Sequence, residues 1–297
     1  MNPAPKAEPR IDQLPVIDVT SEFPKPKKEK PKSFWGRVSK SVRYHLFGPA
    51  PADSNPFTPY MARLNLLDRT ADFPVIFPKH RWCFVRFSDE GDFLTAMMKD
   101  IRPADVVWDV GSFLGMVTVF AGKFASEGRV IAIEPDPALA ARTRKNLVLN
   151  GVKNAEVIEV GLGEEEGTVR LNTSGESGAA PAIMDKGLET YIEIAIKTVD
   201  QLVAEEPARF PNILKIDVEG FETHVLRGMK ATLEDERLRS IYLELHPVYL
   251  FKKGEAIEEP LVLLREAGFE MTYCLVKRQE MVFAFQRKSK KAAASGS

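Results

Sequence analysis

A regular alternation of apolar runs and amphipathic stretches from residue 106 onward is the feature that most constrains the fold. Residues 106–110 (VVWDV) form a nearly continuous apolar run, which is typical of a strand buried inside a parallel sheet. Further strands are predicted at 130–134, 157–160, 213–217 and 241–245. Helices are predicted at 114–125, 137–149 and 199–205, from about 222, and at 260–267. This order favours an α/β fold whose mostly parallel strands are joined by right-handed crossovers.

The segments around this alternation predict a reversed end to the sheet and an irregular insertion. Residues 271–276 and 281–286 are expected to pair as a C-terminal antiparallel hairpin. Residues 169–171 and 192–196 are expected to be shorter strands on either side of the glycine-rich loop 174–187. That loop is either a lid that becomes ordered when an acceptor binds or a plain insertion.

The composition of the chain excludes several classes of protein. Its 297 residues are 44% hydrophobic, which is the share of a globular protein rather than of a disordered one. The two cysteines, Cys83 and Cys274, form no zinc-binding or disulfide pattern. No run of 18 apolar residues is present, and residues 1–10 lack the apolar core of a signal peptide. We therefore expect a cytoplasmic protein without a membrane span, and the sequence leaves its oligomeric state open.

The residues before the alternation are expected to form an N-terminal extension. The expected organisation is a tail rich in proline and lysine at 1–32, a basic amphipathic helix and linker at 33–59, a pre-domain segment at 60–105, the main domain at 106–287 and a tail at 288–297. Within the pre-domain segment we expect strands at 73–77 and 82–87 and a helix at 93–101. An apolar patch at 14–19 is either a docking strand or part of the tail.

Positive charge is concentrated in this extension. Residues 25–45 hold eight lysines and arginines against one acid, a net charge of +7, so the rest of the chain carries −8. A basic arm on an acidic body either contacts a membrane surface or another anionic partner, or is a solvated linker. The acidic body repels phosphates, so we do not expect nucleic acid as a partner.

The turn after the first strand of the main domain suits a positively charged nucleoside. This turn (DVGSFLG) contains Asp109, Gly111, Ser112, Phe113 and Gly115. In a doubly wound sheet it lies at the carboxyl edge of the strands, where ligands bind. A pyrophosphate would require glycine where Phe113 stands, and Asp109 would repel it, which disfavours a nicotinamide dehydrogenase. An amino group and a sulfonium centre tolerate both residues, so S-adenosylmethionine is the expected ligand.

Two later segments fit the remaining parts of such a nucleoside. Glu134 stands 23 residues after Gly111 and is followed by Pro135. This spacing is typical of a carboxylate that accepts hydrogen bonds from ribose hydroxyls. Strand order places Leu162 beside the adenine ring and Glu164, or a backbone N–H, near its amino group. Leu162 and Glu164 could equally be ordinary parts of a loop. The alternative for Glu134 is a solvated acid at a strand end.

Two further strand ends carry acids and a histidine. The segment LKIDVEGFE places Asp217, Glu219 and Glu222 after one strand, and Glu244 and His246 alternate along the end of another. Because the carboxyl ends of parallel strands meet at one edge, we expect these side chains near the cofactor. Acids this dense repel one another unless a cation or hydrogen-bond donors lie among them, which favours substrate handling. The competing interpretation is a helix N-terminus that acids stabilise.

The segments DVG at 109–111, IEP at 133–135, IKTVDQL at 196–202 and, most specifically, LKIDVEGFE at 214–222 resemble the FkbM family of S-adenosylmethionine-dependent methyltransferases. The resemblance covers about residues 80–286. It implies a Rossmann-like class I methyltransferase fold with a mostly parallel seven-stranded sheet and a reversed last hairpin. It also implies O-methylation of a hydroxyl on a sugar, a glycan or another small acceptor. Relatives usually continue the first segment as DVGANxG, whereas Ser112 and Phe113 follow Gly111 here.

The chemistry that the resemblance implies is in-line attack of an acceptor oxygen on the cofactor's methyl group. We expect His246 or Asp217 to take up the acceptor's proton, with Glu219 and Glu222 orienting the acceptor. The acids do not have the spacing of a defined ligand set, so no metal is expected; the rival interpretation is a divalent cation that holds a substrate diol. The alternative function is a non-catalytic protein of the same fold that its basic arm recruits to a membrane or polyanion.

Overall fold

The computed structural model describes the chain in several stretches. These are residues 10–18, 58–77, 80, 91–172, 182–183, 191–277 and 280–288. The chain forms two compact units, one of Met1–Leu64 and Phe73–Asp89 and one of Asn65–Asp72 and Glu90–Ser297. The predicted basic arm, the strand at 82–87, most of both tails and most of the loop at 174–187 lie outside the described residues.

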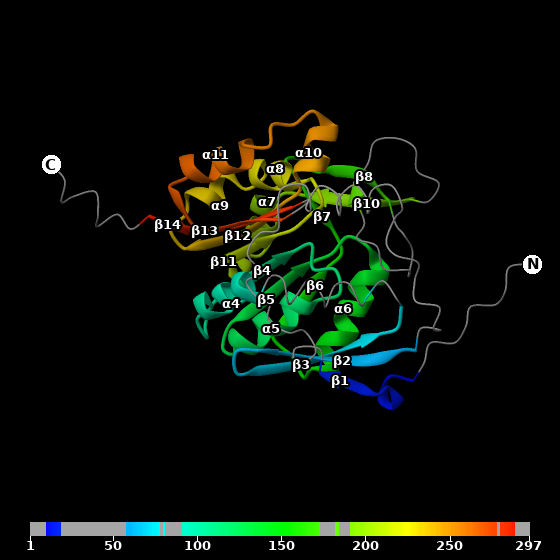
Figure 1. Cartoon of the computed structure of the whole chain (residues 1–297). Coiled ribbons are helices and arrows are strands. Elements are labelled where there is room, and N and C mark those ends of the chain that lie inside the picture. Colours follow the sequence, from blue (N-terminus) through cyan, green and yellow to red (C-terminus); the bar gives the residue numbers. More distant parts are fainter. Residues whose placement is uncertain are drawn as a thin grey trace, which may run out of the picture. The chain divides into compact units, whose positions relative to one another are not determined.

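A seven-stranded sheet forms the centre of the second unit (Figure 1). Its strands are β4 (Val106–Val110), β5 (Arg129–Ile133), β6 (Ala155–Ile158), β11 (Ile213–Ile216), β12 (Ser240–Leu245), β13 (Phe269–Val276) and β14 (Met281–Arg287). They lie in the order β13-β14-β12-β11-β4-β5-β6. β14 is antiparallel to both of its neighbours, and the pairs among the other strands are parallel. The predicted Rossmann-like sheet with a C-terminal antiparallel hairpin is confirmed.

Helices cover both faces of this sheet. They are α4 (Gly91–Asp100), α5 (Met116–Phe124), α6 (Pro137–Leu149), α7 (Val199–Glu205), α8 (Glu222–Arg227), α9 (Lys230–Glu234), α10 (Pro247–Lys253) and α11 (Glu259–Glu266). In Figure 1, α4, α5 and α6 lie on one side of the sheet, and α8, α9 and α11 lie on the other. None of the described helices is long and apolar enough to span a membrane.

Local sequence explains how β4 is buried and where two helices begin. β4 is buried along nearly its whole length, and the indole N–H of its Trp108 donates to the carbonyl of Arg209 at 2.6 Å, which satisfies a buried polar group. Asp136 begins α6 by accepting hydrogen bonds from two backbone N–H groups, with a proline at the first helical position. Thr198 and Gln201 form a capping box at the start of α7.

The strand order places a ligand-binding position between β4 and β11. From β4 the chain first adds β5 and β6 on one side and later adds β11 and β12 on the other. At such a switch point the loops at the carboxyl ends of the two central strands diverge, which leaves room for a ligand. The segments after Val110 and after Ile216 are therefore the two that the topology brings to this position.

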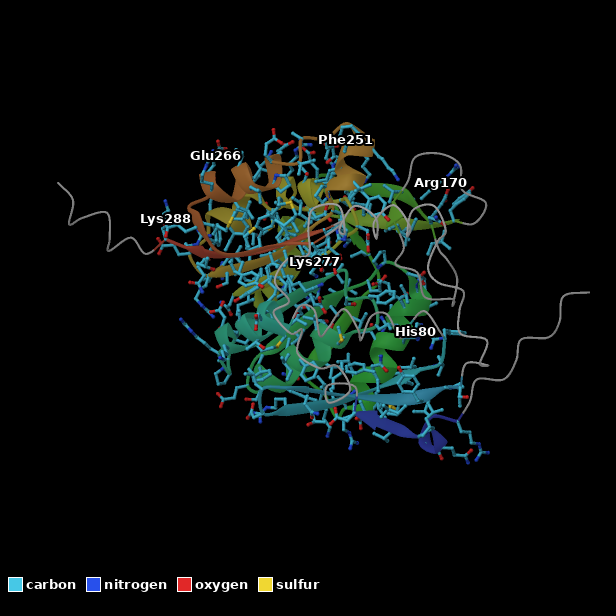
Figure 2. All side chains as sticks on the ribbon, viewed as in Figure 1. His80, Arg170, Phe251, Glu266, Lys277 and Lys288 are labelled. Carbon is cyan, nitrogen blue, oxygen red and sulfur yellow. The ribbon has the colours of Figure 1, made fainter. Side chains whose placement is uncertain are left out.

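A small sheet and a second, separate sheet complete the described chain. The small sheet has the order β7-β10-β8-β9, with β7 (Gly161–Leu162), β8 (Gly167–Asn172), β9 (Ala182–Ile183) and β10 (Tyr191–Lys197). The two short strands predicted there are confirmed, and both are longer than expected. Figure 2 shows Arg170 of β8, whose guanidinium lies 4.6 Å from the centre of the Tyr191 ring. This stacking links β8 to β10 across the sheet.

The second sheet has the order β1-β2-β3. Its strands are β1 (Val16–Asp18), β2 (Tyr60–Leu66) and β3 (Arg69–Val75), and a short 3-10 helix, Ile11–Gln13, precedes β1. The apolar patch at 14–19 thus includes a strand that pairs in parallel with β2. The strand predicted at 73–77 overlaps β3 only at residues 73–75, because β3 begins earlier and ends at Val75, and β2 was not predicted. The helix predicted at 93–101 is α4.

Candidate active site

The turn between β4 and α5 is shaped by two glycines in the left-handed backbone region. Gly111 has a φ of 78°, and a side chain there would place its Cβ 1.8 Å from the carbonyl oxygen of Asp217. Gly115 has a φ of 73°, and its Cβ would lie 2.6 Å from the Cγ2 atom of Thr143. Both positions therefore require glycine, and at Gly111 the first turn lies directly against the backbone of Asp217.

Phe113 in the same turn also has a positive φ, 53°, which is unusual for a bulky residue. Hydrogen bonds on both sides hold it there. Its N–H donates to Oε2 of Glu134 at 2.7 Å, and its carbonyl accepts from Oγ1 of Thr143 at 2.9 Å. The strained backbone thus joins the glycine turn to the acid at the end of β5.

Glu134 follows β5 and is 2% exposed. Its second oxygen, Oε1, accepts the N–H of Asp136 at 3.0 Å. Burial raises the pKa of Glu134 to about 8, and the two backbone hydrogen bonds act against that rise. Each carboxylate oxygen has a further lone pair, so both can accept a hydroxyl hydrogen bond without giving up a backbone partner.

Ser112 carries a buried hydroxyl that no described residue hydrogen-bonds. Its backbone N–H donates to the carbonyl of Ile133, but its Oγ has no partner within the described part of the chain. A buried hydroxyl without a partner is costly, and a polar ligand group would satisfy it. Ser112, Gly111 and Glu134 together fit a nucleoside that brings hydroxyl and amino groups to this edge.

The other residues expected near the cofactor have different surroundings. Leu162 is 3% exposed and belongs to the main hydrophobic core, among residues of β4, β5 and α7. Pro135 is half-buried and adjoins Glu134. Glu164 accepts a hydrogen bond from the guanidinium of Arg227 at 3.3 Å. Its contact with Arg227 gives Glu164 a structural partner.

Lys215, for which the sequence predicts no role, is buried and pairs with two acids. Lys215 on β11 is the register partner of Asp109 on β4. Its Nζ lies 3.4 Å from Oδ1 of Asp109 and 3.3 Å from Oδ2 of Asp217, and Thr118 donates to the other oxygen of Asp109 at 2.6 Å. The signal was present, because Lys215 alternates with Asp217 on one face of a buried strand.

Charge pairing governs the protonation of this trio. Burial raises the pKa of Asp109, and the positive charge of Lys215 acts against the rise. Burial by itself lowers the pKa of Lys215, but the carboxylates of Asp217 and Asp109 outweigh it and raise the pKa. Lys215 therefore stays charged and holds Asp217 at the strand end.

Backbone hydrogen bonds fix the turn after β11, which carries Glu219 and leads to Glu222. Glu219 has a φ of 49° and Gly220 one of 90°. The N–H of Gly220 donates to Oε1 of Glu222 at 2.9 Å, and its carbonyl accepts from Nζ of Lys253 at 2.8 Å. A side chain at Gly220 would lie 2.3 Å from Cβ of Tyr249. This turn is fixed on each side.

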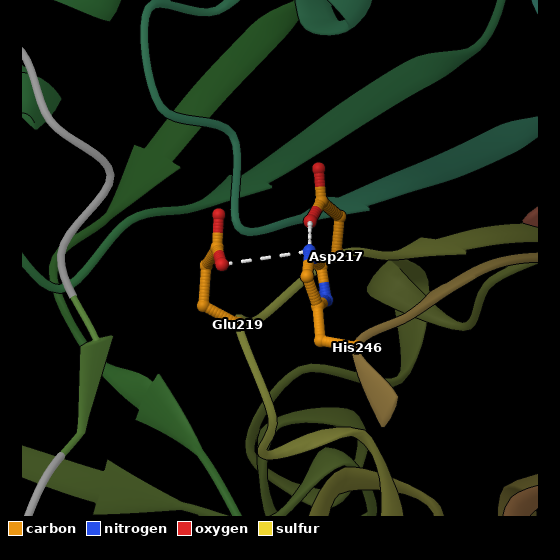
Figure 3. A group of neighbouring side chains, drawn as sticks. All are labelled: Asp217, Glu219 and His246. Atoms are coloured by element: carbon orange, nitrogen blue, oxygen red, sulfur yellow. Dashed lines mark ion pairs between the residues drawn. The ribbon is translucent and has the colours of Figure 1, made fainter. Parts of the chain in front are cut away.

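His246 lies directly after β12 and faces these acids (Figure 3). Its Nδ1 lies 2.7 Å from Oε1 of Glu222, which is fully buried. Its Nε2 lies 3.5 Å from Oε2 of Glu219 and 3.9 Å from Oδ1 of Asp217. Burial of the ring lowers the pKa of His246, but the hydrogen bond with Glu222 and the surrounding carboxylates outweigh it and raise the pKa to about 9.

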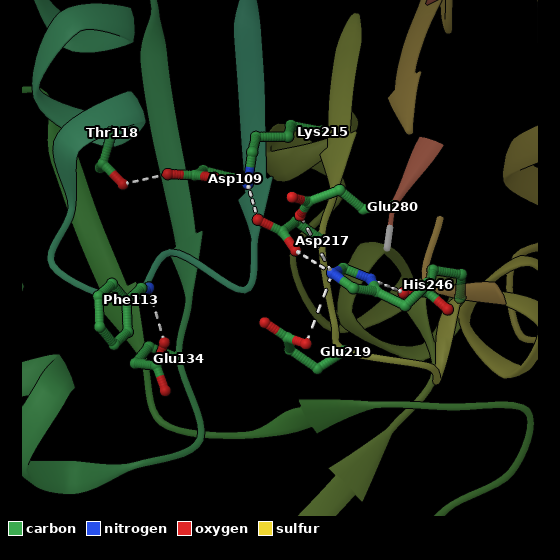
Figure 4. Close-up of polar contacts among 10 residues, drawn as sticks. Asp109, Phe113, Thr118, Glu134, Lys215, Asp217, Glu219, His246 and Glu280 are labelled. Atoms are coloured by element: carbon green, nitrogen blue, oxygen red, sulfur yellow. Dashed lines mark hydrogen bonds and ion pairs between the residues drawn. The ribbon is translucent and has the colours of Figure 1, made fainter. Parts of the chain in front are cut away.

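Figure 4 shows how the predicted site residues divide into two groups. Phe113 and Glu134 form one group. A continuous chain of polar contacts forms the other, through Thr118, Asp109, Lys215, Asp217, His246, Glu219 and Glu280. Glu280, whose Oε2 lies 3.9 Å from Nε2 of His246, was not predicted, because it is far from the other residues in sequence and precedes the reversed strand β14.

Known proteins with similar sequences include two methyltransferases. The 31-O-demethyl-FK506 methyltransferase FkbM of Streptomyces tacrolimicus is 30% identical over 62% of this chain and 78% of its own length. The hexuronic acid methyltransferase AglP of Haloferax volcanii is 28% identical over 59% of this chain and 70% of its own length.

Among solved structures, the methyltransferase FkbM from Methylobacillus flagellatus KT matches with a TM-score of 0.44 and 15% identity. The match covers 64% of this chain and 46%, less than half, of that protein. The family described as "Methyltransferase FkbM domain" matches residues 109–271, which is more than half of the chain. That range contains both halves of the site, apart from Glu280. The chain therefore belongs to the FkbM family of methyltransferases.

Proposed function

We propose that this methyltransferase uses S-adenosylmethionine and transfers its methyl group to a hydroxyl oxygen of a sugar, a glycan or another small acceptor. The observation that carries the proposal is the convergence of Asp217, Glu219 and His246 at the strand edge that also bears Gly111. Proton-accepting groups thus lie next to the backbone turn that fits the cofactor. When bound, the cofactor supplies an electrophilic methyl group on a sulfonium centre.

The residues on the β4–β5 side are proposed to hold the cofactor. Gly111 leaves the backbone open for close approach, and the hydroxyl of Ser112 offers a hydrogen bond that no described residue takes. Glu134 accepts the two ribose hydroxyls on its remaining lone pairs. Asp109, Gly115, Phe113 and Pro135 shape this side of the site. Leu162 belongs to the hydrophobic core, and its proposed role is to support the β4–β5 side of the site.

The residues on the β11–β12 side are proposed to handle the acceptor. Asp217 or His246 takes up the proton that the hydroxyl loses, and Glu219 orients the acceptor. Glu222 is a positioning residue, because it is fully buried and holds the ring of His246 through Nδ1. This role differs from the direct contact with the acceptor that the sequence predicts for Glu222.

The acceptor class is supported by the names of the relatives. Those names give 31-O-demethyl-FK506 and hexuronic acid as acceptors. An oxygen acceptor on a sugar or another small molecule is consistent with both. The site itself agrees, since carboxylates and an imidazole hydrogen-bond hydroxyl groups and accept their protons.

Cofactor binding tests the proposal first. Titration calorimetry with S-adenosylhomocysteine should show one site per chain for the wild type and a loss of affinity for Glu134→Ala. The matched control is Glu270→Ala, because Glu270 is exposed and its partner is the exposed Lys288. An affinity that is equal in all three proteins would remove Glu134 from the site. No binding to the wild type would favour the non-catalytic alternative.

Methyl transfer is the second measurement. Cofactor labelled in its methyl group is incubated with a panel of sugars, uronic acids and glycans, and label in the recovered acceptor is counted. Label bound to oxygen in at least one acceptor class supports the proposal. Label that appears only on nitrogen or carbon acceptors would contradict the assigned chemistry.

A further inference from the structure

His246 lies at the centre of a group of carboxylates that come from separate parts of the chain. We define the His246 cluster as two overlapping groups of candidate ligands that share His246, one with Asp217 and Glu219 and one with Glu244 and Glu280. Of these residues, two follow β11, two lie at the end of β12, and one precedes β14. The antiparallel register pairs Leu245 with Met281, which brings the residues on either side, His246 and Glu280, together.

The free nitrogen of His246 points into this cluster (Figure 4). The side chain is 6% exposed, and Nε2 has no hydrogen-bond partner among the described residues. Three carboxylate oxygens lie 3.5–3.9 Å from it, which is beyond normal hydrogen-bond length. Nε2 of His246 is therefore buried and faces three carboxylate oxygens without a hydrogen bond to any of them.

Carboxylates gathered at this burial repel one another, and a cation among them lowers that repulsion. Lys215 pairs with Asp217 and with Asp109.

The distances and donor types match those around a bound metal ion. Ligand atoms about 2.0–2.2 Å from one cation lie roughly 3–3.5 Å from one another. The 3.5–3.9 Å separations between Nε2 of His246 and the three carboxylate oxygens need only a slight contraction to reach that range, and within each group all ligand atoms lie within 4.8 Å of one another. The pairing of Nδ1 with Glu222 is also the arrangement that fixes most metal-binding histidines, in which a carboxylate orients the ring.

We propose that the His246 cluster binds one divalent cation of the Mn²⁺ or Zn²⁺ class, which holds the acceptor's oxygen next to the cofactor. One imidazole with several carboxylates and no thiolate favours these ions over Ca²⁺ or Cu⁺. An oxygen bound to such a cation loses its proton more readily, so Asp217 or water could accept it near neutral pH. The role in catalysis rests on the proposed function; the binding of the ion does not.

Metal binding is tested on the full chain after treatment with EDTA and removal of the chelator. Mn²⁺ is titrated while the electron paramagnetic resonance signal of the free ion is followed, and Zn²⁺ is tested by competition. The wild type should bind one Mn²⁺ per chain. Glu280→Gln and His246→Ala should each lower the affinity at least tenfold. Glu222→Gln, which alters the support of the ring and of the turn at Gly220, should lower it by about 10–100-fold.

The matched control is Glu270→Gln, which makes the same chemical change on the exposed face of β13 and should bind like the wild type. Circular dichroism and a thermal melt verify that each variant is folded, and Glu280→Gln keeps the test valid if His246→Ala does not fold. Failure of the wild type to bind either ion stoichiometrically would overturn the proposal. Undiminished binding in folded Glu280→Gln and His246→Ala would do the same.

Separate readouts distinguish this proposal from the proposed function. Binding of S-adenosylhomocysteine and methyl transfer that survives EDTA, together with absent Mn²⁺ and Zn²⁺ binding, would contradict the metal site alone. Stoichiometric Mn²⁺ binding without any cofactor binding would contradict the proposed function and leave the metal site standing.

Discussion

Nδ1 of His246 lies 2.7 Å from Oε1 of Glu222, and the same oxygen accepts the backbone N–H of Gly220. Glu222 thus contacts two parts of the site, the ring of His246, which follows β12, and the turn after β11. Because Glu222 is fully buried, its negative charge is screened little by water, and the hydrogen bond to the ring is strong. The orientation of Nε2 toward Asp217 and Glu219 follows from this one contact.

Removal of that contact should impair turnover more than cofactor binding. We predict that Glu222→Ala lowers kcat by about 10–100-fold, because the ring loses the group that orients it. The affinity for S-adenosylhomocysteine should change little, since Glu222 does not touch the β4–β5 side. Glu222→Gln should recover part of the activity, because an amide can still bond both partners. An equal loss of affinity for S-adenosylhomocysteine in Glu222→Ala and Glu222→Gln would indicate a general structural role instead.

The proton acceptors should have the largest effect on the rate. We predict that Asp217→Asn and His246→Asn each lower turnover by about 10²–10⁴-fold, as expected for groups that take up a proton in the transition state. Single-turnover assays at saturating cofactor measure this directly. Wild-type rates in both variants would exclude both residues from the reaction.

Gly111 should not tolerate a side chain. Gly111→Ala adds a Cβ that would lie 1.8 Å from the carbonyl oxygen of Asp217, in addition to the unfavourable φ. Gly151→Ala is the control, because Gly151 has a similar φ of 68° but open space around it. Urea unfolding should give a loss of about 1–2 kcal/mol for Gly151→Ala. Gly111→Ala should lose about 1–3 kcal/mol more. Equal losses would mean that the contact with Asp217 relaxes freely.

Burial of Glu134 should make stability depend on pH. Its pKa is raised from 4.5 to about 8, so folding favours the protonated form. The stability that this group contributes is full below pH 4.5 and is lost as pH rises through about 8. The free energy of unfolding of the wild type should therefore fall between pH 4.5 and 8 relative to that of Glu134→Gln. Parallel curves for the two proteins would show that Glu134 does not titrate in this range.

Lys215 should be essential for the stability of the strand end. Lys215→Met leaves Asp109 and Asp217 without their shared cation, and breaking a buried pair in this way costs about 3–5 kcal/mol. The double variant Lys215→Met/Asp109→Asn removes one of the abandoned charges and should regain part of that loss. Chemical denaturation of both variants provides the comparison. A double variant less stable than the single one would argue against charge pairing as the cause.

Much of the fold could be predicted from sequence because buried parallel strands have an unmistakable pattern. The apolar run at 106–110 located the first turn of the site, and the acid at 134 located the end of the next strand. The terminal hairpin was readable as two apolar runs, 271–276 and 281–286, that a short polar connection separates. β2 was missed because it carries polar residues such as Arg63 and Asn65, and its pattern does not stand out from the linker before it.

The acceptor side could be predicted only in part. Asp217, Glu219 and His246 were found because they follow strands of one parallel sheet. Glu280 was missed because its approach to His246 depends on the register between β12 and β14, which no local pattern reveals. Glu222 was found, but its role was not, because its burial behind His246 depends on how α8 packs. The predictions for the basic arm at 25–45 concern residues outside the described ones.

The close approach of Gly111 to Asp217 has a consequence for how this enzyme could change its specificity. The backbone of Asp217 lies against the first turn at Gly111, and its carboxylate belongs to the proposed acceptor site. A change at either position would disturb both binding partners together. Directed evolution toward a new acceptor should therefore leave this pair untouched and accumulate substitutions on α10, the helix that follows His246, where Val248 and Phe251 are exposed.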